Sequence, residues 1–220
     1  RVFITGCPSI DILKKKNFKK IQKEIIKKNI FTGTGSFFDL KRKFLILIQH
    51  PVTTEYKNAK IQIKETIKAA NILSKKVQIL WLWPNIDAGS DIFSKEIRSF
   101  REKENPKNIY FHKNFSAEHY AYLLSKATCI FGNSSSGIRE ASYFGTPAVN
   151  IGNRQSGRET SKNIINVNHS AINIVNAVNK QIKIKKYSKS FLYGNGNAGK
   201  KISKILSNTK LDIFKKLNYI

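Results

Sequence analysis

Methionine is absent from this chain of 220 residues, and only two cysteines occur, Cys7 and Cys129. The cysteines lie far apart, form no Cys-x-x-Cys pair and have no histidine nearby at metal-ligand spacing. This excludes a disulfide framework and a cysteine-rich metal site, and it favours a reduced, cytoplasmic protein that holds no metal. Because the sequence does not begin with methionine, we expect it to be part of a longer chain.

Long apolar runs are also absent. The longest ones, residues 44–48 and 77–83, are far shorter than the about 20 residues that a membrane-spanning helix needs. The first residues carry a single basic side chain and no apolar core of useful length, so they do not resemble a secretory signal. We therefore expect a protein that binds no membrane.

Acidic residues are scarce, with 14 Asp and Glu against 40 Lys and Arg, which gives a net charge of +26. Only seven of the basic residues are arginines, and the lysines are spread over the expected helix faces, as in products of AT-rich genomes. Such a charge favours nonspecific attraction to nucleic acid. Compositional bias is the simpler interpretation, so we predict no specific nucleic-acid partner, although a basic polyanion-binding module stays open.

Apolar segments alternate with helical patterns through most of the chain. Strands are expected at residues 44–49, 77–83, 108–111, 128–131, 148–151 and 164–167. Helices are expected at residues 58–73, 91–103, 116–126, 137–144 and 170–179. This alternation predicts an α/β fold with a Rossmann-like, doubly wound parallel sheet, and the continuously apolar strands indicate helices on both faces.

The two ends of the chain have weaker patterns. Residues 1–5 look like the end of a strand, and helices are expected from Pro8 onward and over residues 17–29. A loop with two glycines follows at residues 31–38, and basic amphipathic helices are expected at residues 198–206 and 211–217.

The segment Gly132-Asn133-Ser134-Ser135-Ser136-Gly137 follows an expected strand and opens an expected helix. Backbone N–H groups at a helix start, with hydroxyls beside them, bind phosphate oxygens well, although a serine there can also be a simple N-cap. Glu140 lies three residues after Gly137, which has no side chain to complete a capping box. Its carboxylate is therefore available to a ribose diol, and the segment predicts a nucleotide site.

The loop of residues 152–159 contains Arg154 and Arg158 between glycines, directly after an expected strand. Arginine forks pair bidentately with phosphate or carboxylate, so this loop could clamp a diphosphate. A surface salt bridge between Arg158 and Glu159 is the alternative.

Polar residues also follow two other strands. His50 comes just past residues 44–49, at the edge where α/β sites form, and could act as an acid, a base or a phosphate ligand. Asn85 and Asp87 follow the strand at 77–83 and could contact the same ligand. A structural histidine and ordinary turn residues are the alternatives.

Residues 194–199 match the G-x-G-x-x-G pattern of dinucleotide sites. That fingerprint needs a strand before it and an acidic residue about 20 positions later, and both are lacking here. We expect no dinucleotide cofactor.

Five stretches occur in the order found in one enzyme family: GCPSIDIL (6–13), QHPVTTE (49–55), PNIDAGS (84–90), GNSSSGIREASYFGTPAVNIGNRQSGRE (132–159) and YGNGNAGKKISKIL (193–206). Together they resemble the UDP-N-acetylglucosamine 2-epimerases, and in particular the hydrolysing branch of sialic and legionaminic acid pathways. The resemblance implies conversion of UDP-N-acetylglucosamine and water to N-acetylmannosamine and UDP, without a metal or other cofactor.

The resemblance also implies roles for individual residues. His50 is the active-site histidine, and the UDP contacts are Asn85, Phe115 at the uracil, Ser134 and Ser135 at the phosphates, Glu140 at the ribose, and Arg154. Asp87, Ser136 and Arg158 are further candidates beside them.

The family consists of two Rossmann-like domains in the GT-B arrangement, and this chain resembles the C-terminal one. Residues 1–10 would end a missing N-terminal domain and link it, residues 11–185 would bind the nucleotide, and residues 186–220 would pack back on the missing domain. The family's acidic catalytic residues match no position here, so we expect this chain to be inactive alone; a homodimer is also expected.

Two other functions stay open within this fold. A relative acting on UDP-2,4-diacetamido-trideoxyglucose would have the same motifs, and a GT-B glycosyltransferase could use a similar half to bind its donor.

Overall fold

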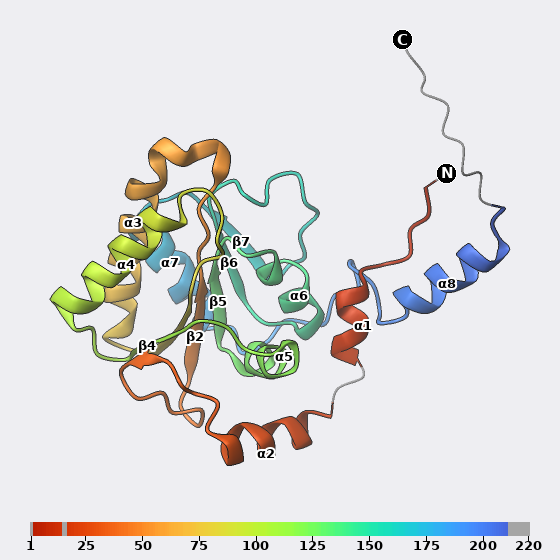
Figure 1. The fold of residues 1–220 in the computed structure, drawn as a ribbon, viewed down its shortest axis with the longest axis horizontal. Coiled ribbons are helices and arrows are strands. Elements are labelled where there is room, and N and C mark those ends of the chain that lie inside the picture. Colours follow the sequence, from red (N-terminus) through yellow and green to blue (C-terminus); the bar gives the residue numbers. More distant parts are fainter. Residues whose placement is uncertain (1, 15–16, 211–220) are drawn as a thin grey trace, which may run out of the picture.

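The computed structural model describes residues 2–14 and 17–210. Within these residues seven strands form a single sheet in the order β1-β4-β3-β2-β5-β6-β7 (Figure 1). The strands are β1 Thr34–Gly35, β2 Phe44–Ile48, β3 Gln78–Leu82, β4 Ile109–His112, β5 Cys129–Gly132, β6 Ala148–Ile151 and β7 Ile164–Val167. All neighbouring pairs are parallel except β1 and β4, which confirms the predicted α/β sheet.

Helices cover both faces of the sheet. The structure has α1 Pro8–Lys14, α2 Phe18–Lys28, α3 Ala59–Ser74, α4 Ser90–Glu104, α5 Ala117–Lys126, α6 Glu140–Phe144, α7 Ala171–Ile182 and α8 Ala198–Asn208, with 3-10 turns η1 Thr53–Asn58 and η2 Ser135–Gly137. Leu45 and Leu47 of β2 face a core with α3, α4 and α7. Ile46 and Ile48 face the opposite core with α2 and α5, so the continuous apolar run serves two interfaces.

The order in which successive strands are added to the sheet reverses beside β2. The strands β3 and β4 extend from β2 to one side, whereas β5, β6 and β7 extend to the other. Ligands of open α/β sheets bind outside the carboxyl ends of the strands at such a reversal. The fold therefore directs attention to the residues that follow β2 and β5.

Gly132 makes the approach of β5 to β2 possible. Its φ is +128°, and a Cβ atom at this position would overlap the carbonyl group of Ile48. The main-chain N–H group of Asn133 donates to this carbonyl oxygen at 3.0 Å. Only glycine fits the close pairing that places the two strand ends side by side.

The two end segments pack on each other. The N–H groups of Ala198 and Gly199 donate to the Asp11 carboxylate at 2.9 and 2.7 Å, which caps α8. Gly6 approaches Gly194 so closely that a Cβ atom on Gly6 would lie 3.1 Å from the Gly194 Cα. The glycines of residues 194–199 therefore have a packing role, and α1 and α8 lie side by side in Figure 1.

Four expectations need correction or restriction. Residues 2–5 form no strand, and Val2 and Ile4 are 95% and 97% exposed, because no strand within the described residues pairs with them. The helix expected at 137–144 begins as the 3-10 turn η2, and α6 starts only at Glu140. The loop at 31–38 contains the edge strand β1, which is too short to give a pattern. The expected strand residue Arg1 and the helix at 211–217 lie outside the described residues.

No helix in the described part is long and apolar enough to cross a membrane.

Candidate functional site

The loops after β2, β3, β5 and β6 meet at the carboxyl edge of the sheet. Contacts join His50, Asn85, Asp87, Asn133 and Arg154 there, each of which follows one of these strands. Four of the five were predicted site residues. The parallel register makes this convergence necessary, because the ends of parallel neighbours lie at the same edge.

His50 is held in one orientation. Its main-chain N–H group donates to Asn133 Oδ1 and its carbonyl oxygen accepts from Asn133 Nδ2, both at 2.7 Å. Its ring atom Nδ1 accepts a hydrogen bond from the Asn85 N–H group at 3.0 Å. An accepting Nδ1 places the ring proton on Nε2 in the neutral form.

The electrostatic surroundings keep this ring neutral. His50 is only 5% exposed, and its pKa is lowered to about 4, mainly by burial. The Arg154 cation contributes to this lowering of the pKa, and the Asp87 carboxylate opposes it. Near neutral pH the ring is therefore a hydrogen-bond donor through Nε2–H, a form suited to binding an anionic oxygen.

Asn133 connects three loops, although it was not among the predicted site residues. It is fully buried, and its side chain makes the two bonds to the His50 backbone. Its carbonyl oxygen accepts from Arg154 Nη1 at 3.3 Å and from Gln155 Nε2 at 2.8 Å. Its position directly after an apolar strand was the signal that could have identified it.

Arg154 and Asp87 form a long ion pair across the edge. Arg154 Nη2 lies 3.9 Å from Asp87 Oδ2, and the two side chains are 29% and 38% exposed. A partly exposed pair at this distance contributes little to stability. The guanidinium can therefore exchange the carboxylate for a ligand phosphate at small cost. Asn85 itself is exposed and contributes its backbone to the site.

The three serines differ in what they offer. Ser134 Oγ accepts from the Ser136 N–H group at 3.4 Å, so the N-cap alternative holds for the 3-10 turn. Ser136 is 9% exposed and its hydroxyl lies 2.6 Å from the Tyr120 hydroxyl, which points it into the protein. The main-chain N–H groups of Ser134 and Ser135 donate to no described residue. Two such neighbouring N–H donors can bind an anion even if the serine hydroxyls take no part.

Arg139 links this turn to Glu140. Its Nη2 atom donates to Ser135 Oγ at 3.2 Å and lies 3.5 Å from Glu140 Oε1. Glu140 Oε1 also accepts from Ser9 Oγ at 2.9 Å, whereas Oε2 is buried and has no partner among the described residues. Arg139 and Ser9 were missed from the sequence, because both contacts depend on the tertiary fold.

Phe115 and Arg158 are less closely connected. The Phe115 ring is 8% exposed and stacks on His112 at 3.9 Å, and its N–H group donates to Asn114 Oδ1 at 2.9 Å. It follows β4, two strands away from β2. Arg158 is exposed and lies near Tyr193. Burial raises the pKa of the Tyr193 hydroxyl, and the Arg158 cation opposes this rise. No hydrogen bond or ion pair within the described residues joins either side chain to His50.

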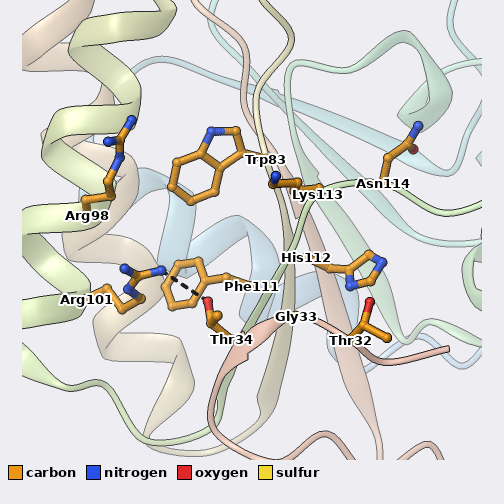
Figure 2. Close-up of a pocket in the computed structure, with 10 residues that line it drawn as sticks. All are labelled: Thr32, Gly33, Thr34, Trp83, Arg98, Arg101, Phe111, His112, Lys113 and Asn114. Carbon is orange, nitrogen blue, oxygen red and sulfur yellow. Dashed lines mark hydrogen bonds between the residues drawn. The ribbon is translucent and has the colours of Figure 1, made fainter. Parts of the chain in front are cut away.

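A separate hollow of 610 Å³ lies past β4 on the α4 side of the sheet (Figure 2). Trp83, Arg98 and Arg101 line it, and Arg101 Nη1 donates to Thr34 Oγ1 at 3.1 Å. It contains none of the predicted site residues. The described residues also include no group of three or more His, Cys, Asp or Glu that could hold a metal ion.

The fold and this edge define a Rossmann-like domain with a candidate ligand site at its topological reversal. The family model described as UDP-N-acetylglucosamine 2-epimerase matches residues 1–207. The chain therefore belongs to the UDP-N-acetylglucosamine 2-epimerase family, as its motifs predicted.

Similar proteins agree with this membership. The hydrolysing UDP-N,N'-diacetylbacillosamine 2-epimerase of Legionella pneumophila is 30% identical over 210 residues, which are 96% of this chain and 52% of the relative. The hydrolysing GDP/UDP-N,N'-diacetylbacillosamine 2-epimerase of Campylobacter jejuni is 30% identical over 193 residues, or 86% and 46% of the two chains. This chain thus spans about half the length of the curated relatives it matches.

A solved structure has the same fold. The UDP-GlcNAc 2-epimerase of Methanocaldococcus jannaschii, in complex with UDP-GlcNAc and UDP, superposes with a TM-score of 0.70 at 18% identity. The match covers 94% of this chain and 55% of that one. It confirms the Rossmann-like α/β fold and relates it to the GT-B epimerases.

Proposed function

We propose that this chain is the C-terminal, UDP-binding half of a hydrolysing UDP-sugar 2-epimerase. Family membership and the shared length of about half of each relative support this assignment. The observation that carries it is the buried, neutral His50 beside Arg154 at the point where the sheet reverses. A neutral donor next to a cation, together with two N–H groups that donate to no described residue, suits a diphosphate.

In the reaction proposed for the whole protein, a base removes the C2 proton of the sugar and the C1–O bond breaks. UDP leaves with the electron pair, and a C1=C2 double bond forms. Water then adds its oxygen to C1, and a proton returns to C2 from the opposite face. The products are a free 2-epimerised sugar and UDP.

This chain's part in that reaction is to hold the leaving group. Arg154, the Nε2–H group of His50 and the N–H groups of Ser134 and Ser135 would stabilise the charge that develops on the diphosphate. Glu140 would accept a ribose hydroxyl, and Phe115 would lie at the uracil end. Asn85, Asp87, Ser136 and Arg158 stay predicted contacts. The acidic groups that move protons would come from the other half.

Two sugars are candidates within this function. UDP-N-acetylglucosamine is the substrate for which the family is named. The two relatives at 30% identity are named for N,N'-diacetylbacillosamine, which supports the diacetamido alternative. A protein extended upstream to the full length of these relatives, assayed with both UDP-sugars, would distinguish them by the free sugar released.

The direct test is a calorimetric titration of UDP into this chain at moderate salt, with AMP as the control nucleotide. Saturable binding that prefers UDP is expected. Equal binding of UDP and AMP would contradict the proposal. Release of UDP and a 2-epimerised sugar without any acceptor would exclude a glycosyltransferase, and steeply salt-dependent nucleic-acid binding without a response to UDP would favour a basic polyanion-binding module.

The remaining expectations belong to the whole protein. Residues 1–10, 11–185 and 186–220 stay the proposed linker, nucleotide domain and return segment, although α1 crosses the first of these boundaries. A cytoplasmic location and a homodimer are likewise proposals.

A further inference from the structure

Glu140 is held through only one of its two carboxylate oxygens. Ser9 Oγ donates to Oε1 at 2.9 Å, and Arg139 Nη2 lies 3.5 Å from the same atom. Oε2 is buried without a hydrogen-bond partner among the described residues, in a side chain that is 12% exposed. A buried carboxylate oxygen without a donor is unfavourable, so a hydroxyl that reaches it is bound strongly.

A second buried atom beside it is also unpaired. Arg139 Nε has no hydrogen-bond partner among the described residues, although its Nη1 and Nη2 atoms contact Cys7 Sγ and Ser135 Oγ. An arginine and a carboxylate normally form a bidentate pair through two nitrogens and two oxygens. Such a pair would occupy both Glu140 oxygens. The hydrogen bond from Ser9 opposes this arrangement by fixing Oε1.

Ser9 is itself fixed by the two end segments of the described chain. Its hydroxyl lies 3.1 Å from Cys7 Sγ, and the Cys7 N–H group donates to the Tyr193 carbonyl oxygen at 2.8 Å. Asp11, in the same helix, accepts the two N–H groups that begin α8. Residues 6–9 therefore form a strap that lies against Glu140 and is tied to the C-terminal end segment.

We propose that Ser9 is a positioning residue that keeps Glu140 from pairing bidentately with Arg139 and so keeps Oε2 for the diol of a ribonucleotide. The inference rests on the proposed function, because it assumes that Glu140 faces a nucleotide. It adds a residue outside the predicted contacts, and it makes selection for ribose depend on the strap. Without the Ser9 hydroxyl, Glu140 turns to Arg139 and Oε2 is lost to the ligand.

The test compares UDP with 2′,3′-dideoxyuridine 5′-diphosphate, which lacks the diol, by calorimetric titration of this chain. A hydrogen bond to a charged acceptor corresponds to about a tenfold or larger preference for UDP in the unchanged protein. Ser9→Ala should reduce that preference several-fold and leave the affinity for the dideoxy ligand unchanged. Ser9→Thr, which keeps the hydroxyl, should restore it.

Two further variants keep the result interpretable. Ser9→Cys keeps about the same side-chain size and loses the strong hydrogen-bond donor. It replaces the alanine variant if a thermal melt shows that the alanine variant is not folded. Ser125→Ala removes a hydroxyl that donates to the Tyr122 carbonyl in α5 and should change nothing.

An unchanged UDP preference in folded Ser9→Ala would overturn the proposal. Equal losses for both ligands would also overturn it, because they would mean that Ser9 only supports the fold. If the unchanged chain binds neither diphosphate, the proposed nucleotide site is contradicted. That outcome differs from UDP binding that is the same with and without the Ser9 hydroxyl, which contradicts only the role of Ser9.

Discussion

Replacing Asn133 with alanine removes both hydrogen bonds that hold the His50 backbone. The two bonds are 2.7 Å long, and Asn133 and His50 are 0% and 5% exposed, so water does not readily replace the lost partner. A buried polar group left without a partner costs about 1–3 kcal/mol. One donor and one acceptor are affected, so the free energy of unfolding should fall by about 2–6 kcal/mol.

Urea unfolding followed by circular dichroism measures this change, with an unaltered m-value as evidence that the native state stays compact. Asn173→Ala is the matched control, because its exposed side chain donates only to Asn168. The control should alter stability by less than about 0.5 kcal/mol. An Asn133→Ala protein within that limit would refute the reasoning that this side chain holds the β2 and β5 loops together. At urea concentrations where the variant is folded, UDP affinity should also fall, since His50 loses its fixed place.

Four further predictions concern the same edge of the sheet. Arg154→Ala should weaken UDP binding by about tenfold or more, whereas Arg98→Ala in the separate hollow should not; unchanged affinity in the first variant removes Arg154 from the site. Glu140→Gln should weaken uridine nucleotides more than free diphosphate in calorimetry, and equal losses would contradict a ribose contact. The His50 ring should show no NMR titration between about pH 5.5 and 8, because its pKa is lowered to about 4; stability should fall as the pH drops from about 6.5 towards 4, where the unfolded chain takes up a proton first. Gly132→Ala should prevent or severely destabilise folding, because its Cβ atom overlaps the β2 backbone, and a cooperative melt at the original temperature would exclude that conclusion.

The sequence predicted the sheet because each strand is a short, continuously apolar run between helical patterns. The runs at 44–48 and 129–132 differ from their predicted bounds by one residue at most, and β2 and β5 both face two cores. Residue order also placed His50 and Arg154 correctly at one edge, since that follows from parallel strands alone. Periodicity carries this information because burial on two faces constrains every residue of the run.

The side-chain contacts of the candidate site could not be predicted from the apolar pattern of the sequence. Asn133 and His50 are 83 residues apart, and Ser9 and Glu140 are 131 apart, so no local pattern links them. The strand expected at residues 1–5 was wrong for its described part, because apolar residues form a strand only beside a partner. Helix α6 is shorter than expected because the turn after Ser134 has 3-10 geometry. The N–H groups of Ser134 and Ser135, which precede its first turn, donate to no described residue. Pairings across the fold, rather than sequence period, decide these features.

The two ends of the proposed nucleotide site therefore depend on different parts of the chain. The phosphate end is built on β2, β5 and β6, whose residues lie in the continuous core, and Asn133 joins their loops. The ribose end depends on residues 6–9, which contact Arg139 and Glu140 at the start of α6 and are anchored by Tyr193 and α8. Few buried contacts hold that strap, so it should open at lower free energy than the sheet edge. Hydrogen exchange should then show weaker protection at Cys7 than at Asn133, and UDP should raise protection most at Cys7. Equal protection of the two amides in the unliganded chain would contradict this division of the site.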